Sequence, residues 1–196
     1  MCQKEVDKLI DYLYGKNKPP HEPRYKRRQE LIERACSIYG DYGDSLHKEL
    51  LQLLNGYAIE NQTDWNYDSC FSFLALLHPG VPYDVRDKAS AIELVQRFGG
   101  TAYFLTLQIS ALGPYYTYRF CRRAYSHSTD RLIDQTSERP FSLDQDETLK
   151  KVVRYCESKD FKRLNREFLD QIVPGIALDI TEEGEVTVYN CLFVDT

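Results

Sequence analysis

Residues 101–123, TAYFLTLQISALGPYYTYRFCRR, constrain the fold most, because they predict two strands joined by a turn. From Thr101 to Ser110, large apolar residues alternate with mostly smaller or polar ones. Successive side chains of a strand point to opposite faces of the sheet, so this alternation is typical of a strand. Pro114 has no amide hydrogen and follows Gly113, which favours a turn at this position. We therefore expect a hairpin at the centre of the fold.

The return strand of this hairpin has one aromatic side and one mixed side. The aromatic side carries Tyr116, Tyr118, Phe120 and Arg122, and the mixed side carries Tyr115, Thr117, Arg119 and Cys121. Strands that bind single-stranded nucleic acid interleave rings and arginines, because bases stack on the rings and guanidinium groups hold phosphates. Tyr and Arg also dominate contacts between proteins. In the purely structural interpretation, half of the rings face the core and the arginines mark the exposed end of the strand.

Periodic apolar residues predict helices before the hairpin. The first 58 residues form an N-terminal helical layer, with helices at about 3–14, 23–39 and 44–57. A strand over 70–77 and a helix from Asp84 or Asp87 to Phe98 lead into the hairpin. With the hairpin they make up a central unit at 69–124.

The segments after the hairpin predict a loop, two helices and a second hairpin. Residues 126–140 are polar and predict a long loop. Residues 142–173 predict a helix pair, whose first helix starts at a capping box at Ser142 and whose second starts near Asp160. Residues 176–194 predict two short strands around a turn that ends at Gly184.

Taken together, these elements predict one α+β domain. A length of 196 residues suits a single domain with a sizeable core. Helices interleaved with two hairpins favour an antiparallel or mixed sheet of four to five strands, packed by helices. If the strand at 70–77 ran parallel to the strand from Thr101, the helix between them would form a right-handed crossover.

Charge and hydropathy exclude several classes of function. The formal charge of −5 argues against a dedicated nucleic-acid or anionic-membrane binder, which usually needs a basic surface. No stretch approaches the roughly 20 apolar residues of a membrane helix. The first 16 residues, MCQKEVDKLIDYLYGK, have no apolar signal core. We therefore expect a cytoplasmic protein.

The cysteines predict buried, reduced thiols. They are spread evenly along the chain and form no Cys-x-x-Cys pair, at Cys2, Cys36, Cys70, Cys121, Cys156 and Cys191. A disulfide framework clusters in small secreted domains, and a zinc site needs closely spaced ligands. We expect no metal and no cofactor.

The histidines support the alternative of an enzyme. The chain contains no nucleophile elbow, no His-Glu-x-x-His, no phosphate-binding glycine loop and no dinucleotide fingerprint. His78 follows the strand at 70–77, and His127 shares the polar loop with Asp130. A small hydrolase or another enzyme with a His-containing site is therefore the first alternative.

The expected function is that of a non-enzymatic intracellular protein-binding module. The chain lacks a catalytic motif, carries 15 tyrosines and is acidic. In general character it resembles the small acidic immunity proteins that neutralise bacterial toxins. This resemblance is one of class, covers no definable stretch and carries over no residue.

The resemblance implies that acidic groups in the long loop, Asp130, Asp134 and Glu138, steer a basic partner. Tyr116 and Tyr118 are the expected anchors for a protein partner, provided that their face is exposed. The second alternative is a single-stranded nucleic-acid binder that uses the strand with Arg119 and Arg122.

Overall fold

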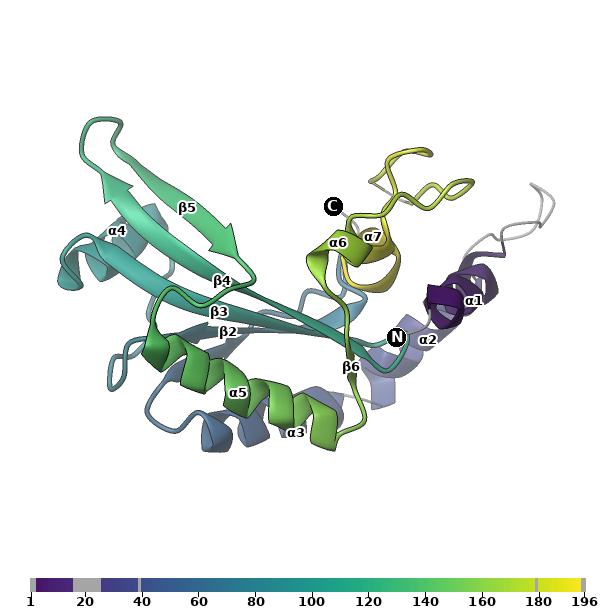
Figure 1. The fold of residues 1–196 in the computed structure, drawn as a ribbon, viewed down its shortest axis with the longest axis horizontal. Helices are drawn as coiled ribbons and strands as arrows, with labels where there is room; N and C mark the ends of the chain where they lie inside the picture. Colours follow the sequence, from purple (N-terminus) through teal and green to yellow (C-terminus); the bar gives the residue numbers. More distant parts are fainter. Residues whose placement is uncertain (1–2, 16–25, 39, 179, 195–196) are drawn as a thin grey trace.

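Six strands form one sheet around the predicted hairpin in the computed structural model (Figure 1). Five of them run antiparallel in the order β1-β2-β3-β4-β5, and β6 pairs in parallel with the outer edge of β4. The strands are β1 (Ala58–Asn61), β2 (Cys70–Leu76), β3 (Thr101–Ser110), β4 (Tyr115–Ser126), β5 (Arg131–Ser137) and β6 (Lys162–Arg163). The predicted α+β class is confirmed.

The structure describes residues 3–15, 26–38, 40–178 and 180–194, except for the side chains of 35–41. The expected start of the second helix at Pro23 and the thiols of Cys2 and Cys36 lie outside this part. The helices are α1 (Gln3–Tyr14), α2 (Lys26–Ile38), α3 (Gly40–Leu53), α4 (Lys88–Arg97), α5 (Leu143–Ser158), α6 (Arg166–Leu169) and α7 (Val188–Leu192). Within the described residues, none of them has the length and apolar character needed to cross a bilayer.

The hairpin at 101–123 forms as predicted. β3 and β4 pair antiparallel, with Leu107 opposite Tyr118 and Thr106 opposite Arg119. β2 also pairs antiparallel with β3, so the condition for a right-handed crossover, two parallel strands, is not met.

Two strands lie where the sequence predicts none. β5 occupies the middle of the expected loop at 126–140, and β1 follows the expected helical layer. Most residues of β5 are exposed, so its sequence lacks a clear apolar period. Its partner β4 stabilises it instead, through a ladder in which Asp134 lies opposite Arg123. Such long-range pairing leaves no signal in the local pattern.

The predictions for the C-terminal third need correction at two places. The second helix of the expected pair is reduced to the short α6, and β6 precedes it. Asp160 has a φ of 62°, in the left-handed region that interrupts a helix, and Asn165 starts α6 by accepting the N–H of Phe168.

The hairpin expected over 176–194 is replaced by loops and α7. Thr187 and Asn190 form a capping box that starts this helix. A helix of five residues is too short to show a helical period, so the β-branched run Val186-Thr187-Val188 favours a strand in the sequence pattern.

One face of the sheet, the covered face, carries the aromatic side of β4. Tyr116, Tyr118 and Phe120 are buried there against α3 and α5, through residues such as Leu50 and Val152. Figure 1 shows these two helices side by side beneath the strands. As predicted, α5 starts after Ser142, whose side chain accepts the N–H of Gln145.

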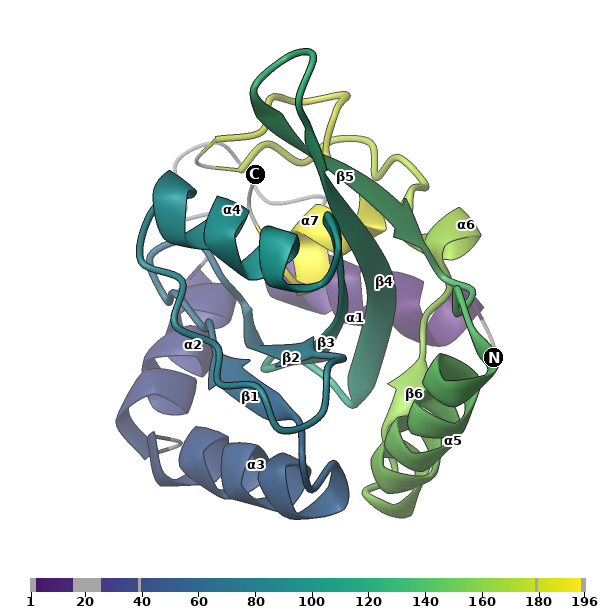
Figure 2. The ribbon, with the colours of Figure 1, turned by 90° about the vertical axis from the view of Figure 1, so that its left-hand side faces the viewer.

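Among the described residues, the opposite face, the open face, is covered only at its two ends. At the hairpin turn, Leu112 and Tyr115 pack with α1 and α7, and at the other end Phe104 packs with Leu94 and Val95 of α4. The three N-terminal helices therefore divide between the faces, because α3 lies on the covered face. Figure 2 shows α4 at one end of the open face, with α7 and α1 behind it.

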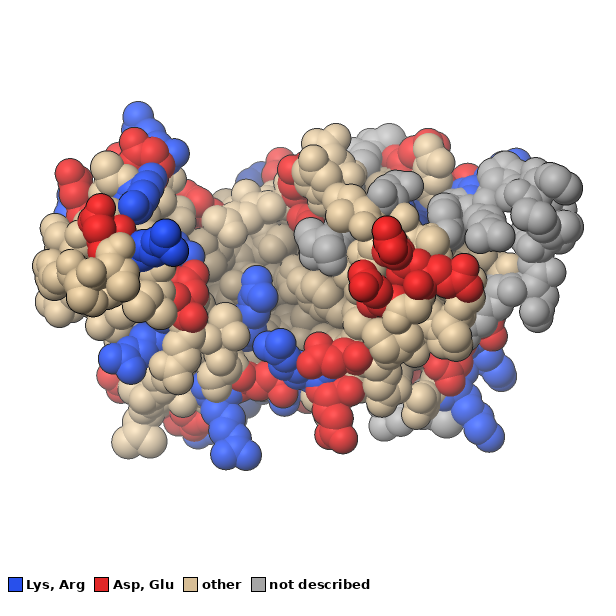
Figure 3. All heavy atoms as spheres, turned by 90° about the horizontal axis from the view of Figure 1, so that it is seen from above, with Lys and Arg blue, Asp and Glu red and all other residues tan. Residues whose placement is uncertain are grey.

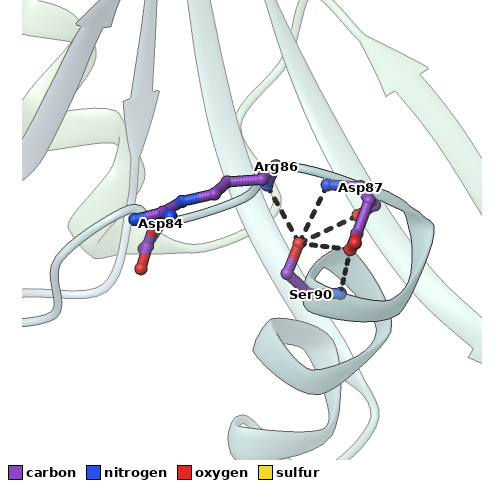
Figure 4. Close-up of polar contacts among 4 residues, drawn as sticks. All are labelled: Asp84, Arg86, Asp87 and Ser90. Carbon is purple, nitrogen blue, oxygen red and sulfur yellow. Dashed lines mark hydrogen bonds and ion pairs between the residues drawn. The ribbon is translucent and has the colours of Figure 1, made fainter.

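A capping box fixes the start of α4, as the sequence predicted for Asp87. The carboxylate of Asp87 accepts the N–H of Ser90 at 2.8 Å, and the Ser90 hydroxyl oxygen accepts the N–H of Asp87 at 3.0 Å (Figure 4). Arg86 pairs with Asp84 at 2.8 Å just before the helix. These contacts hold in place one of the two blocks that border the open face.

Candidate binding site in the open face of the sheet

The middle of the open face is polar, and no described helix lies over it. We call it the hollow, and define it by Ser72, Thr106, Gln108, Thr117 and Arg119 of β2, β3 and β4. Figure 3 looks into this region from above: a depression of mostly uncharged surface lies between two raised blocks, with basic side chains in it. Four of these residues are 6–8% exposed, although their side chains are polar.

A cavity of about 130 Å³ opens at one side of the hollow. Gln108, Thr117 and Arg119 contribute to its floor, while Asp170 after α6 and Tyr189 of α7 line its wall. By liquid volume it would hold about four water molecules. It can therefore receive a side chain or a short piece of backbone.

The wall of the cavity is tied to its floor. The hydroxyl of Tyr189 donates to Oε1 of Gln108 at 3.1 Å, and its ring stacks on Phe193 with centroids 5.7 Å apart. Burial raises the pKa of Tyr189, so the hydroxyl keeps its proton at neutral pH. The side chain of Tyr189 is thus held as a donor toward the sheet.

Arg119 is the charged residue at the centre of the hollow. Its side chain is exposed, and no described residue forms a hydrogen bond or an ion pair with its guanidinium. The other arginines nearby are paired: Arg123 with Asp134 at 2.6 Å, Arg163 with Glu138 at 3.0 Å and Arg166 with Asp170 at 3.2 Å. Its guanidinium therefore remains available to an anionic group from outside.

The aromatic residues expected as anchors do not reach this surface. Tyr116 and Tyr118 are 1% and 5% exposed, so the condition attached to them, an exposed face, is not met. Arg163 lies over the ring of Tyr118, with its guanidinium carbon 4.3 Å from the centroid. The rings are part of the core, and bases could not stack on them in this fold.

The remaining candidates are spread over different surfaces. Arg122 is exposed on the covered-face side, beyond the reach of the hollow, because it alternates with Arg119 along β4. Asp130 accepts the hydroxyl of Tyr125 at 2.5 Å at the tip of the β4–β5 hairpin. The structure thus separates Arg119 from Arg122 and from Asp130.

The two other acidic candidates are engaged by cations of the chain. Arg123 donates to both carboxylate oxygens of Asp134, at 2.8 and 2.6 Å, and this contact lowers the pKa of Asp134, with a smaller contribution from Arg119. Glu138 pairs with Arg163 and also accepts the N–H of Arg166 at 3.0 Å. Neither carboxylate is left without a partner.

The histidine candidates have structural contacts. His78 stacks on Phe98 with centroids 3.6 Å apart, and its Nε2 accepts the N–H of Tyr103 at 3.2 Å. Burial lowers the pKa of His78, which favours the neutral ring. His127 lies edge-on to Tyr125 at 4.8 Å near the hairpin tip. Among the described residues, no three His, Cys, Asp or Glu side chains are grouped to hold a metal ion.

The described cysteines form no disulfide, at Cys70, Cys121, Cys156 and Cys191. Burial raises the pKa of Cys121 to about 11 and that of Cys156 to about 12, and it raises that of Cys70 well above the ordinary value. These three are therefore protonated at neutral pH, and none is an activated nucleophile.

Sequence reasoning named Arg119 but missed the residues around it. The polar side of β3, with Thr106 and Gln108 in an otherwise apolar hairpin, was the available signal. The sequence gives no local signal for Tyr189, because this residue reaches the sheet from a segment 81 positions further along the chain than Gln108.

Comparison with known proteins identifies no relative: no family model, no curated protein and no solved structure matches the chain.

Proposed function

We propose that this protein is a protein-binding module whose partner inserts a projecting segment into the hollow. The observation that carries this proposal is the exposed guanidinium of Arg119, which forms no hydrogen bond or ion pair with a described residue and lies in a polar depression of the sheet. An arginine in a partly enclosed site is a frequent centre of binding energy, because it combines charge, five donors and a planar surface.

The polar residues of the floor indicate a binding site and not a packing defect of the core. Uncovered sheet faces in a folded domain are commonly polar, but here Gln108 and Thr117 are almost fully enclosed by their neighbours. A segment that entered the hollow would find hydrogen-bonding groups and a charge, which together set its orientation.

The finer hypothesis of an immunity-type inhibitor relied on free acidic groups that steer a basic partner. Asp130, Asp134 and Glu138 are all engaged within the chain. We therefore propose protein binding through Arg119, with these acids outside the docking surface.

Affinity capture from cells of the native host tests this proposal. The bait proteins are the wild type, Arg119→Ala, and the matched control Arg122→Ala, which removes an exposed arginine of the same strand on the other face. We expect the wild type and the control to enrich the same partner, and Arg119→Ala to lose at least tenfold of it, as for a central interface arginine.

Two results would contradict the proposal. If no protein is enriched by the wild type over an unrelated bait, the chain is not a binding module. If Arg119→Ala recovers the partner as well as Arg122→Ala does, the partner binds elsewhere. Circular dichroism of each variant confirms beforehand that the baits are folded.

A further inference from the structure

The outer edge of β4 contains a gap in its pairing. β5 covers the upper part of this edge, from Phe120, which lies opposite Ser137, to Ser126. β6 covers the lower part, opposite Tyr115 and Tyr116. Between them, Thr117, Tyr118 and Arg119 have no ladder partner on this side among the described strands.

The main-chain groups of Tyr118 face this gap. The N–H of Lys162 donates to the carbonyl of Pro114 at 2.9 Å, and the N–H of Leu164 donates to that of Tyr116 at 2.9 Å. Alternate residues of an antiparallel strand direct their amide groups to the same edge, so those of Tyr118 follow the same direction. No described backbone or side-chain group bonds to them.

An unpaired peptide group at this place is unusual. Tyr118 is 5% exposed, and the great majority of buried backbone N–H and C=O groups are hydrogen-bonded. The gap opens into the cavity described above, which Tyr118, Ser137 and Glu138 also line. One further extended residue would complete the ladder between β5 and β6.

We propose that this gap is the recognition point for an extended peptide segment with an acidic residue. A small residue of the segment pairs with the N–H and C=O of Tyr118, and its neighbour directs a carboxylate to Arg119. The inference rests on the proposed function, because it states which chemistry of the partner enters the hollow.

The side chains that the bound segment must carry follow from the alternation of side chains along a strand. A residue opposite Tyr118 points its side chain to the covered face, where Arg163 lies over the ring of Tyr118 and leaves little room. The next residue lies opposite Arg119 and shares its face. The guanidinium fork matches a carboxylate, whereas Glu138 and Asp170 at the cavity wall disfavour a doubly charged phosphate.

Peptide titration followed by amide NMR tests this inference. The probe is acetyl-Glu-Gly-Glu-N-methylamide, which offers an acidic neighbour on both sides of the glycine, so it can bind in either direction. Its control is acetyl-Gln-Gly-Gln-N-methylamide. We expect saturable shifts at the amide of Tyr118, slower hydrogen exchange there, and about fivefold weaker binding of the control, the equivalent of one partly exposed ion pair.

Variants assign the preference to one arginine. Arg119→Gln is expected to bind both peptides equally, while Arg122→Gln is expected to keep the preference of the wild type. Preference for the acidic peptide that survives in Arg119→Gln would overturn the assignment.

The same experiment separates this inference from the proposed function. If the partner is captured but the probe leaves the Tyr118 amide unshifted up to its solubility, the inference about the gap is wrong and the binding function stands. If the probe binds with its acidic preference but no partner is captured, the inference about the gap stands and the proposed binding function is wrong. Strong exchange protection of the Tyr118 amide in the free protein would also overturn the inference, since it would mean that no gap exists.

Discussion

The two faces of β4 have different surroundings, although alternate residues of one strand supply both. On the covered face, Tyr116, Tyr118 and Phe120 are almost completely enclosed by α3 and α5. On the open face, Thr117 and Arg119 line a hollow that the helices leave uncovered. A period of two residues thus separates the groups that stabilise the fold from the groups that are available for binding.

This difference shows that composition alone misplaces a site. Tyr and Arg are mixed in the sequence of β4, and the mixture favours a binding surface. In the structure the rings stabilise the core, and of the two exposed arginines, Arg119 and Arg122, only Arg119 lies in the hollow. Substitutions on either face of β4 and around the hollow test this division.

Truncation on the covered face should destabilise the protein strongly. Phe120 is 0% exposed, so Phe120→Ala removes a large buried ring and leaves a cavity. We expect a loss of about 3–5 kcal/mol in the free energy of unfolding, measured by urea denaturation. Leu143→Ala, at a residue that is 86% exposed, is the control and should change it by less than about 0.5 kcal/mol. Equal effects would mean that the covered face is not the core.

Removal of the hydroxyl of Tyr189 should have a moderate effect. Tyr189→Phe keeps the ring on Phe193 but leaves Oε1 of Gln108 without its donor. The expected loss is about 1 kcal/mol in the free energy of unfolding. Tyr67→Phe, at an exposed tyrosine, provides the comparison and should be neutral. A neutral Tyr189→Phe would show that the wall of the hollow is not held by this bond.

The ion pair between β4 and β5 should contribute at neutral pH and vanish in acid. The contact with Arg123 lowers the pKa of Asp134 from the ordinary value of 3.8, so folding favours the ionised carboxylate. Its stabilisation is therefore present above the ordinary pKa and is lost as the pH falls through the lowered value.

Both partners are partly exposed, at 28% and 40% for their side chains, so solvent screens the pair. Asp134→Asn should cost at most about 1 kcal/mol at neutral pH. The difference from wild type, measured by thermal unfolding, should disappear at a pH well below 3.8. A difference that grows in acid would contradict this assignment.

The smallest effect on stability is expected at the arginine of the hollow. Arg119 has no hydrogen bond or ion pair with a described residue, so Arg119→Ala should change the free energy of unfolding by no more than about 0.5 kcal/mol. Arg122→Ala is the matched control and should behave in the same way. A loss of several kcal/mol on Arg119→Ala in urea denaturation would assign this side chain to the fold instead of to binding.

Much of the architecture was predictable because its signals are local. The alternation from Thr101 and the turn at Pro114 predict the central hairpin, and Asp87 and Ser142 predict the starts of α4 and α5. The elements that were wrong or missed, β1, β5, β6 and α7, are short or exposed. Their stability comes from partners distant in sequence, which a local pattern does not contain.

By itself, the sequence determined that β4 has two chemically different sides, and that Arg119 lies on the opposite side from Tyr116 and Tyr118. Only the tertiary structure decided which side is covered, because the packing of α3 and α5 depends on contacts between remote segments. It also placed β5 and β6 along one edge with Tyr118 between them. The gap at Tyr118 and the wall at Tyr189 therefore exist only in the folded chain, where long-range pairing brings together groups that no local period connects.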